Sequence, residues 1–223
     1  MRRLVVFDID DTLYLERDYV RSGFAAVGAW ARTELGVADV GERAWAAFEA
    51  GVRGRIFDEA LVACGVGANG SVMSQLVDVY RSHAPTIEPL PDVRAWLAGR
   101  PTDVACAVVT DGPPVSQRAK AAALGLAGWA DPIVFTEELG PGRGKPHPAA
   151  FARLEAATGL AGGVCAYVAD NPAKDFAGPR SRGWRTVRVR REGSLHAAVA
   201  SGDDVDAEIN GLAELDGALG WQA

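Results

Sequence analysis

The stretch FDIDDTLY (residues 7–14) places three carboxylates directly after the apolar run of residues 4–7. These aspartates repel one another, and burying them costs solvation free energy unless a positive charge compensates them. The alternation of side chains along a strand points Asp8 and Asp10 toward one side as the backbone begins to turn. A divalent cation between them would supply the missing charge. The stretch therefore predicts a buried strand that ends at a metal-binding turn.

Short apolar runs rich in β-branched residues recur along the chain and predict further strands. The runs that predict strands cover residues 4–7, 104–109, 133–135, 164–168 and 186–189. Helical patterns that begin near a proline and stop at a glycine lie between most of them, at residues 115–124, 148–157 and 173–182. Strands that alternate with helices favour a parallel sheet with crossover helices. The predicted fold class is therefore α/β, with a doubly wound, Rossmann-like parallel sheet.

The long stretch between the first two strands shows no strand pattern and is predicted to be wholly helical. Apolar residues recur in it at helical spacing, and glycines separate the patterns. An all-helical insert directly after the first strand of an α/β core is expected to form a cap over the carboxyl end of that strand. We therefore predict a core domain from residues 1–14 and 86–223 and a helical cap domain from residues 15–85.

Composition and charge are those of an ordinary globular protein and exclude several classes of partner. Hydrophobic residues make up 48% of the 223 residues and charged residues 23%. The net charge of −6 and the lack of a Lys/Arg block disfavour a nucleic acid polymer or an anionic membrane as partner. No apolar run reaches membrane-spanning length, and the start resembles neither a signal peptide nor an anchor.

The cysteines, the histidines and the tail receive no chemical role from the sequence. The three cysteines are far apart and lack a CxxC motif, which predicts reduced thiols in a cytoplasmic protein. The histidines show no metal-ligand spacing. The tail beyond Gly193 is acidic, with one helical pattern at Ile209, Leu212 and Leu215, and is expected to pack at an edge. Both a monomer and a homodimer remain open.

Candidate functional residues stand where the first two strands end, at the sheet edge where open α/β sheets bind ligands. Asp8 and Asp10 follow the first strand. Thr110, Asp111 and Gly112 follow the second, and they offer a hydroxyl and flexible backbone N–H groups that hold an anion. Phosphate oxygens suit this arrangement.

The next two strand ends carry a lysine and two more carboxylates. Lys145 follows the third strand in a loop rich in Gly and Pro, where its ammonium would act as a point charge on a phosphate or on the nucleophile. Asp170 leaves the fourth strand and Asp175 follows one turn later, so both can reach a metal or its bound waters, and hard carboxylate oxygens favour Mg²⁺. Each of these residues alone also fits a helix cap, a turn or a solvated loop. Their order at successive strand ends favours catalysis.

The segments FDIDDT, VVTDG, GKPHP and VADNPAKD resemble, in order, the four signature motifs of the haloacid dehalogenase (HAD) superfamily. The resemblance spans nearly the whole chain and implies an Mg²⁺-dependent phosphatase with a helical C1-type cap between its first two motifs. Ala169 departs from the pattern, since many members have glycine there. The dehalogenases of the superfamily lack an acid at the place held here by Asp10, so the resemblance favours phosphate chemistry over carbon–halogen cleavage.

This resemblance leads to a mechanistic hypothesis. Asp8 is expected to attack the phosphorus of a phosphomonoester and form an aspartyl-phosphate, while Asp10 protonates the leaving oxygen and later activates water. Mg²⁺ is expected at Asp8, at Asp10 through its backbone carbonyl, and at Asp170, with Asp175 nearby. Thr110 and Lys145 are expected to bind the phosphoryl oxygens, together with Asp111 and Gly112.

Specificity is expected to come from the cap, because the motif residues recognise only the phosphoryl group. Tyr14, Arg17, Arg53 and Arg55 are candidates to face the leaving group, and a packed tyrosine with solvated arginines is the alternative. The predicted substrate is a small phosphate ester, such as a sugar phosphate, a nucleotide or another metabolite phosphate. A phosphomutase, a phosphonate-cleaving relative, a 2-haloacid dehalogenase and a non-catalytic binding module remain open as alternatives.

Overall fold

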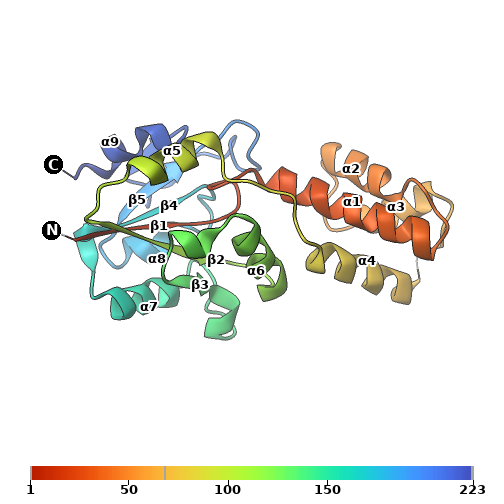
Figure 1. Ribbon diagram of the computed structural model, residues 1–223, viewed down its shortest axis with the longest axis horizontal. Helices are drawn as coiled ribbons and strands as arrows, with labels where there is room; N and C mark the ends of the chain where they lie inside the picture. The colour runs from red at the N-terminus through yellow and green to blue at the C-terminus, as the bar shows by residue number, and fades with distance from the viewer. Residues whose placement is uncertain (1, 68, 222–223) are drawn as a thin grey trace. The chain divides into compact units, whose positions relative to one another are not determined.

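The computed structural model describes residues 2–67 and 69–221. The chain divides into two compact units. Met1–Glu16 and Glu88–Ala223 form the first unit, which we call the α/β core, and Arg17–Ile87 form the second, which we call the helical unit. Figure 1 shows the strands in the first unit and a group of helices in the second.

The α/β core contains a six-stranded sheet in the order β3-β2-β1-β4-β5-β6, and all neighbouring strands are parallel. The strands are β1 (Arg3–Phe7), β2 (Val104–Thr110), β3 (Ile133–Phe135), β4 (Cys165–Ala169), β5 (Arg185–Val189) and β6 (Ala207–Ile209). The predicted α/β class with a Rossmann-like parallel sheet is confirmed. The strand order reverses between β1 and β4, and the carboxyl ends of strands at such a point form the usual ligand crevice of open α/β sheets.

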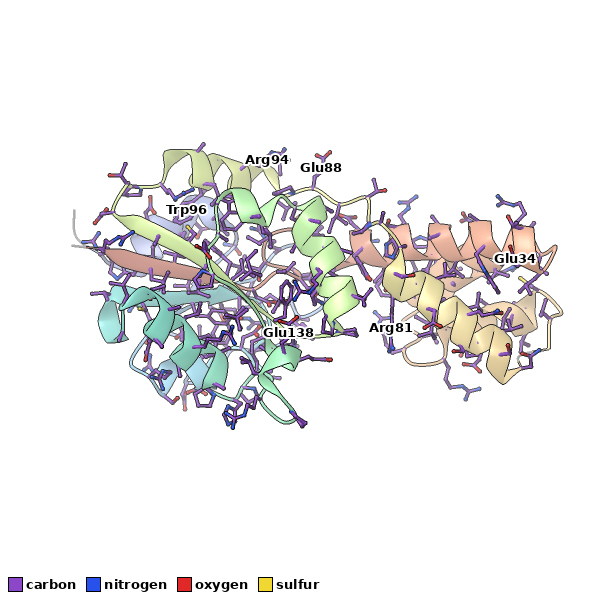
Figure 2. All side chains as sticks on the ribbon, turned by 60° about the horizontal axis from the view of Figure 1, so that its bottom comes forward. Glu34, Arg81, Glu88, Arg94, Trp96 and Glu138 are labelled. Atoms are coloured by element: carbon purple, nitrogen blue, oxygen red, sulfur yellow. The ribbon has the colours of Figure 1, made fainter. Side chains whose placement is uncertain are left out.

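Helices cover both faces of this sheet. Figure 1 shows α5 (Pro91–Gly99) and α9 (Leu215–Leu219) on one side and α7 (Ala149–Thr158) on the other. Successive side chains of a strand point to opposite faces. Accordingly, Val6 of β1 lies in one buried cluster with Phe151 of α7, whereas the ring of Phe7 meets Trp96 of α5 edge-on at 5.4 Å. At the surface of the core, Arg94 of α5 lies 3.6 Å from Glu88 (Figure 2).

The tail adds a strand that the sequence analysis did not predict. Ile209 belongs to β6, which pairs with β5 in the register Val189↔Ile209, and not to a helix. The helical pattern failed because Leu212 begins the short helix η4 (Leu212–Glu214) only after a break at Gly211. The sequence of β6, AEI, has a glutamate at its centre and therefore lacks the apolar run that predicted the equally short β3. The expectation that the tail packs at an edge is met, since β6 is one of the two edge strands of the sheet.

Two helices of the core also differ from the prediction. The helix expected over residues 173–182 is limited to α8 (Ala177–Arg180), because turns occupy the preceding residues and the Asp175 carboxylate accepts the N–H of Asn171 at 2.8 Å. Helix α5 is not predicted from the sequence, because Pro85, Pro89 and Pro91 indicate only the return of the chain to the core; of these three prolines, Pro91 alone lies in the helix. Helix α6 (Pro114–Ala123) lies close to its predicted range.

The helical unit has a hydrophobic core of its own. Its helices are α1 (Glu16–Glu34), α2 (Val40–Glu49), α3 (Ile56–Ala63) and α4 (Gly70–Ser82). Apolar side chains from each of them form one buried cluster that includes Phe24, Phe48, Leu61 and Leu76. Glu34 and Arg81 project from the surface of this unit (Figure 2). Among the described residues, no helix of either unit has both the length and the apolar character needed to cross a membrane.

Gly178 of α8 allows a close approach to the loop that carries Lys145. A Cβ atom at this position would lie 2.6 Å from the carbonyl oxygen of Pro146 and 2.9 Å from Cε2 of Phe151. We expect Gly178→Ala to lower the free energy of unfolding by about 1–3 kcal/mol in urea denaturation, because the backbone must shift. Gly217→Ala in α9 is the matched control, since a Cβ there meets no atom within 4 Å. Equal destabilisation of the two variants would contradict this packing.

Candidate active site

Three buried carboxylates meet at the carboxyl ends of β1 and β4. These strands are neighbours, and the N–H of Asp8 donates to Val168 O at 2.9 Å. The residues that follow the two strands, Asp8 and Asp170, therefore come together. Asp8, Asp170 and Asp175 each offer an oxygen, and these oxygens lie within 4.8 Å of one another. We call these three residues the acidic cluster.

Lys145 supplies a positive charge to the acidic cluster. Its Nζ lies 2.8 Å from Asp8 Oδ1 and 2.6 Å from Asp175 Oδ1, and its side chain is completely buried. The same Nζ donates to the hydroxyl of Tyr167 at 3.0 Å. The ammonium thus donates hydrogen bonds to Asp8 and Tyr167, whereas its contact with Asp175 is an ion pair in which Asp175 Oδ1 accepts no hydrogen bond from the described residues. One ammonium cannot balance three carboxylates, so the cluster remains negative when all of them ionise.

Burial and mutual repulsion shift the titration of the cluster. Burial raises the pKa of Asp8 to about 6, although the Lys145 ammonium acts in the opposite direction. Burial, followed by the charges of Asp8 and Asp175, raises the pKa of Asp170 to about 9. Asp170 Oδ2 is buried and finds no hydrogen-bond partner among the described residues. Asp175 Oδ1 likewise accepts no hydrogen bond from the described residues, and an all-carboxylate donor set with two such oxygens fits a hard divalent cation.

The side chain of Asp10 has a different environment. Lys120 Nζ of α6 lies 2.7 Å from each of its carboxylate oxygens, and the hydroxyl of Tyr14 donates to Oδ1. Burial alone would raise the pKa of Asp10, but the Lys120 ion pair and the hydrogen bonds from Lys120 and Tyr14 lower it. Among the described residues, the carboxylates that could share a metal do not include this side chain. A metal contact through its backbone carbonyl stays a prediction.

Thr110 and Gly112 lie where β2 ends. The Thr110 hydroxyl is buried and donates to Gln117 Oε1 of α6 at 3.0 Å. Gly112 has φ +116°, in the region that favours glycine, and a Cβ there would lie 3.0 Å from Gln117 Nε2. The roles predicted for both residues in phosphate binding stay predictions.

Asp111 joins two loops of the candidate site. Its Oδ1 accepts the N–H of Lys145 at 3.1 Å and the hydroxyl of Thr136, and its Oδ2 lies 3.4 Å from Lys174 Nζ. Although burial acts in the opposite direction, the charge of Lys145 and the Thr136 hydrogen bond lower the pKa of Asp111. The Asp111 carboxylate therefore fixes the backbone from which the Lys145 side chain extends.

The last candidates are the tyrosine and the three arginines expected to face the leaving group. The structure shows contacts for them, and their role in substrate binding stays a prediction. Tyr14 is fully buried in the α/β core and contacts Asp10. In the helical unit, Arg17 pairs with Glu49 at 2.6 Å, and Arg53 lies over the ring of Phe48 at 4.3 Å. Arg55 is exposed and directly precedes α3.

Sequence reasoning missed Lys120, Gln117 and Tyr167. The first two have a signal in the sequence, because Gln117 and Lys120 are three residues apart and share the buried face of α6 with Ala121. Buried polar side chains at helical spacing indicate a partner across the interface. Tyr167 gives no such signal, since it belongs to an apolar strand pattern. Asp11 was also given no role, yet its carboxylate accepts the backbone N–H groups of Glu16 and Leu195 at 2.8 and 2.7 Å.

Comparisons with known proteins show which family and which individual proteins the chain resembles. A family model described as haloacid dehalogenase-like hydrolase matches residues 2–181. The chain is 34% identical over 171 residues to a phosphoserine phosphatase of Thermus thermophilus, with 76% of this chain and 66% of that protein covered. It is 30% identical over 225 residues to a glyceraldehyde 3-phosphate phosphatase of Methanopyrus kandleri, with 96% of each chain covered.

A solved structure extends the comparison to the fold. The crystal structure of a 2-haloacid dehalogenase from Pseudomonas syringae pv. Tomato DC3000 matches with a TM-score of 0.66 and 24% identity over 99% of each chain. At this identity the match shows a shared fold and carries no conclusion about the reaction. The resemblance inferred from the four motif segments is confirmed by the family model.

Proposed function

We propose that this chain, which belongs to the haloacid dehalogenase-like hydrolases, removes the phosphoryl group from a small phosphate ester with the help of Mg²⁺. The observation that carries the proposal is the acidic cluster with its buried lysine. In it, Asp8 lies beside the ammonium of Lys145 and the carboxylates of Asp170 and Asp175. Two relatives are named for phosphoserine and glyceraldehyde 3-phosphate, both of them phosphomonoesters with three-carbon skeletons. This supports a small metabolite as substrate.

Asp8 is the nucleophile of the proposed reaction. Lys145 holds its Oδ1 at 2.8 Å, so the carboxylate has a fixed orientation as its other oxygen attacks phosphorus. Its pKa of about 6 leaves most of the carboxylate ionised at neutral pH. Asp8, Asp170 and Asp175 would hold Mg²⁺ directly or through water. When bound, the cation supplies the positive charge that lets an anionic nucleophile approach an anionic phosphate.

Asp10 is the proton donor and acceptor. Its carboxylate lies two residues beyond Asp8 in the sequence and does not belong to the acidic cluster. Because 21% of its side chain is exposed, water and a leaving group can reach it. Asp10 gives a proton to the leaving oxygen and then takes one from the water that attacks phospho-Asp8. Lys145 and Thr110 are the groups proposed to bind the phosphoryl oxygens. The helical unit is proposed to select the substrate.

A panel of phosphate esters tests the proposal. We expect phosphate release from at least one of phosphoserine, glyceraldehyde 3-phosphate, sugar phosphates and nucleotides, and we expect EDTA to abolish it and Mg²⁺ to restore it. A 2-haloacid assayed with EDTA is the comparison substrate. Halide release from that compound without phosphate release from any ester would overturn the proposal in favour of a dehalogenase.

Binding of Mg²⁺ is expected to release protons. The pKa of Asp170 is about 9 in the cation-free protein, so this carboxyl is protonated at pH 7 and must lose its proton to bind a cation. Release of about one proton per Mg²⁺ is therefore expected at pH 7, with an affinity that rises with pH up to about 9. Calorimetric titration in buffers of different ionisation enthalpy measures this release. Asp170→Asn should remove it, and Mg²⁺ binding to the wild type without proton release would contradict the assignment.

A further inference from the structure

Two buried side chains outside the four motif segments hold the carboxylate of Asp10. Lys120 extends from α6, and its Nζ lies 2.7 Å from both Asp10 oxygens. Tyr14 follows the turn after β1, where a bridge pairs it with Asp10, and its hydroxyl donates to Oδ1. Lys120 is 4% exposed and Tyr14 is fully buried. All three residues belong to the α/β core.

These contacts restrict Asp10 to one orientation and leave one of its oxygens less occupied. Each carboxylate oxygen accepts about two hydrogen bonds. Lys120 uses one acceptor position on each oxygen, and Tyr14 uses a second position on Oδ1. The remaining position lies on Oδ2. A side chain held from two different elements loses the freedom to rotate, which is the requirement for a group that must meet a water in one geometry.

We propose that Lys120 and Tyr14 are positioning residues that hold the Asp10 carboxylate so that Oδ2 accepts a proton from the hydrolytic water. The inference rests on the proposed phosphatase function. In this step a water proton passes to Asp10 Oδ2, the water oxygen forms a bond to phosphorus, and the bond between phosphorus and the Asp8 oxygen breaks. The products are inorganic phosphate and the free Asp8 carboxylate. Asp10 enters the step as an anion, the form that its contacts with Lys120 and Tyr14 favour.

The expected signature is a split between kcat and kcat/KM in Tyr14→Phe and Lys120→Gln. With p-nitrophenyl phosphate, the leaving phenolate departs without a proton, so formation of phospho-Asp8 does not need Asp10. We expect kcat to fall about tenfold or more while kcat/KM stays within about twofold, because only the second half of the reaction slows. We also expect a burst of about one p-nitrophenol per enzyme molecule. Phosphorylated enzyme should accumulate in samples quenched with acid.

Two further variants separate positioning from general damage. Lys120→Arg keeps a fork that can bind both carboxylate oxygens and is expected to recover part of the lost kcat. Arg118→Gln removes a cation from the same helix, where Arg118 is 60% exposed and pairs with Glu138, and is expected to leave the kinetics unchanged. Tyr14→Phe alone carries the test if Lys120→Gln does not fold, because it removes only a hydroxyl.

The outcomes separate this inference from the function on which it rests. Equal falls in kcat and kcat/KM without a burst, or wild-type kinetics in both Tyr14→Phe and Lys120→Gln, would overturn the positioning role while leaving a phosphatase. A wild-type protein that turns over neither p-nitrophenyl phosphate nor any other phosphate ester in Mg²⁺ would overturn both.

Discussion

Replacement of Asp8 by asparagine is expected to lower kcat by about 10⁴-fold or more, which is the usual cost of removing a nucleophile. The amide has the size of the carboxylate but lacks the charge and nucleophilicity needed to attack phosphorus. Lys145 keeps its ion-pair partner Asp175 at 2.6 Å, so its buried ammonium is not left without a counter-charge. Phosphate release under saturating substrate and Mg²⁺ measures the effect. Asp203→Asn, on the exposed tail, is the matched control and should retain full activity.

Stability distinguishes a chemical role of Asp8 from a structural one. Its pKa is raised in the folded protein to about 6, so its contribution to the free energy of unfolding is present at low pH and is lost as pH rises through that value. Asp8→Asn should therefore be at least as stable as the wild type at pH 8 in EDTA. Thermal unfolding measures this. An inactive variant with a strongly lowered melting temperature, or a stable one with more than about 1% of wild-type activity, would contradict the nucleophile assignment.

Replacement of Lys145 by methionine is expected to reduce both activity and stability. The ammonium is completely buried between Asp8 and Asp175, and its loss leaves two buried carboxylates without their counter-charge. Breaking such a pair from one side typically costs about 3–5 kcal/mol of the free energy of unfolding. The phosphoryl group also loses a proposed cationic contact, which typically costs about 10²–10³ in rate. Urea denaturation in EDTA and steady-state kinetics measure the two effects.

The Lys145→Met variant should depend more strongly on Mg²⁺ for its stability. Without the ammonium, the acidic cluster is more negative, so a cation that binds the folded state raises the melting temperature more than it does in the wild type. Lys174→Met is the matched control, because Lys174 is 39% exposed and lies 3.4 Å from Asp111, and exposed pairs contribute about 0–1 kcal/mol. Wild-type stability of Lys145→Met in EDTA would show that the buried ion pair is not needed.

The strands of the sheet centre were predictable because buried parallel strands are continuous apolar runs. β1 and β4 are fully apolar or nearly so, and their predicted limits differ from the observed ones by one residue at most. β6 gave no such signal, because its sequence, AEI, has a glutamate at its centre, whereas the equally short edge strand β3 is the apolar run IVF. The residues before α8 form turns because the Asp175 carboxylate binds a backbone N–H group there.

The meeting of Asp8, Asp170, Asp175 and Lys145 was also predictable, because parallel strands bring their carboxyl ends to one edge of the sheet. Contacts between side chains far apart in the sequence could not be predicted. Lys120 contacts Asp10 across 110 positions of sequence, and this contact depends on how α6 packs against the core. The same holds for Asp11, whose carboxylate accepts the Leu195 N–H and so joins the turn after β1 to the tail. Such contacts depend on tertiary packing, which a local pattern does not specify.

Chemical trapping of the phosphorylated residue tests the central claim most directly. The wild-type protein is quenched in acid during turnover of a phosphate ester with Mg²⁺, and borohydride then reduces any acyl phosphate. Peptide mapping by mass spectrometry identifies the reduced residue. The account predicts homoserine in place of Asp8, in samples with substrate and in none without it. Reduction of a different carboxylate, or an unmodified Asp8 under conditions of steady turnover, would contradict it.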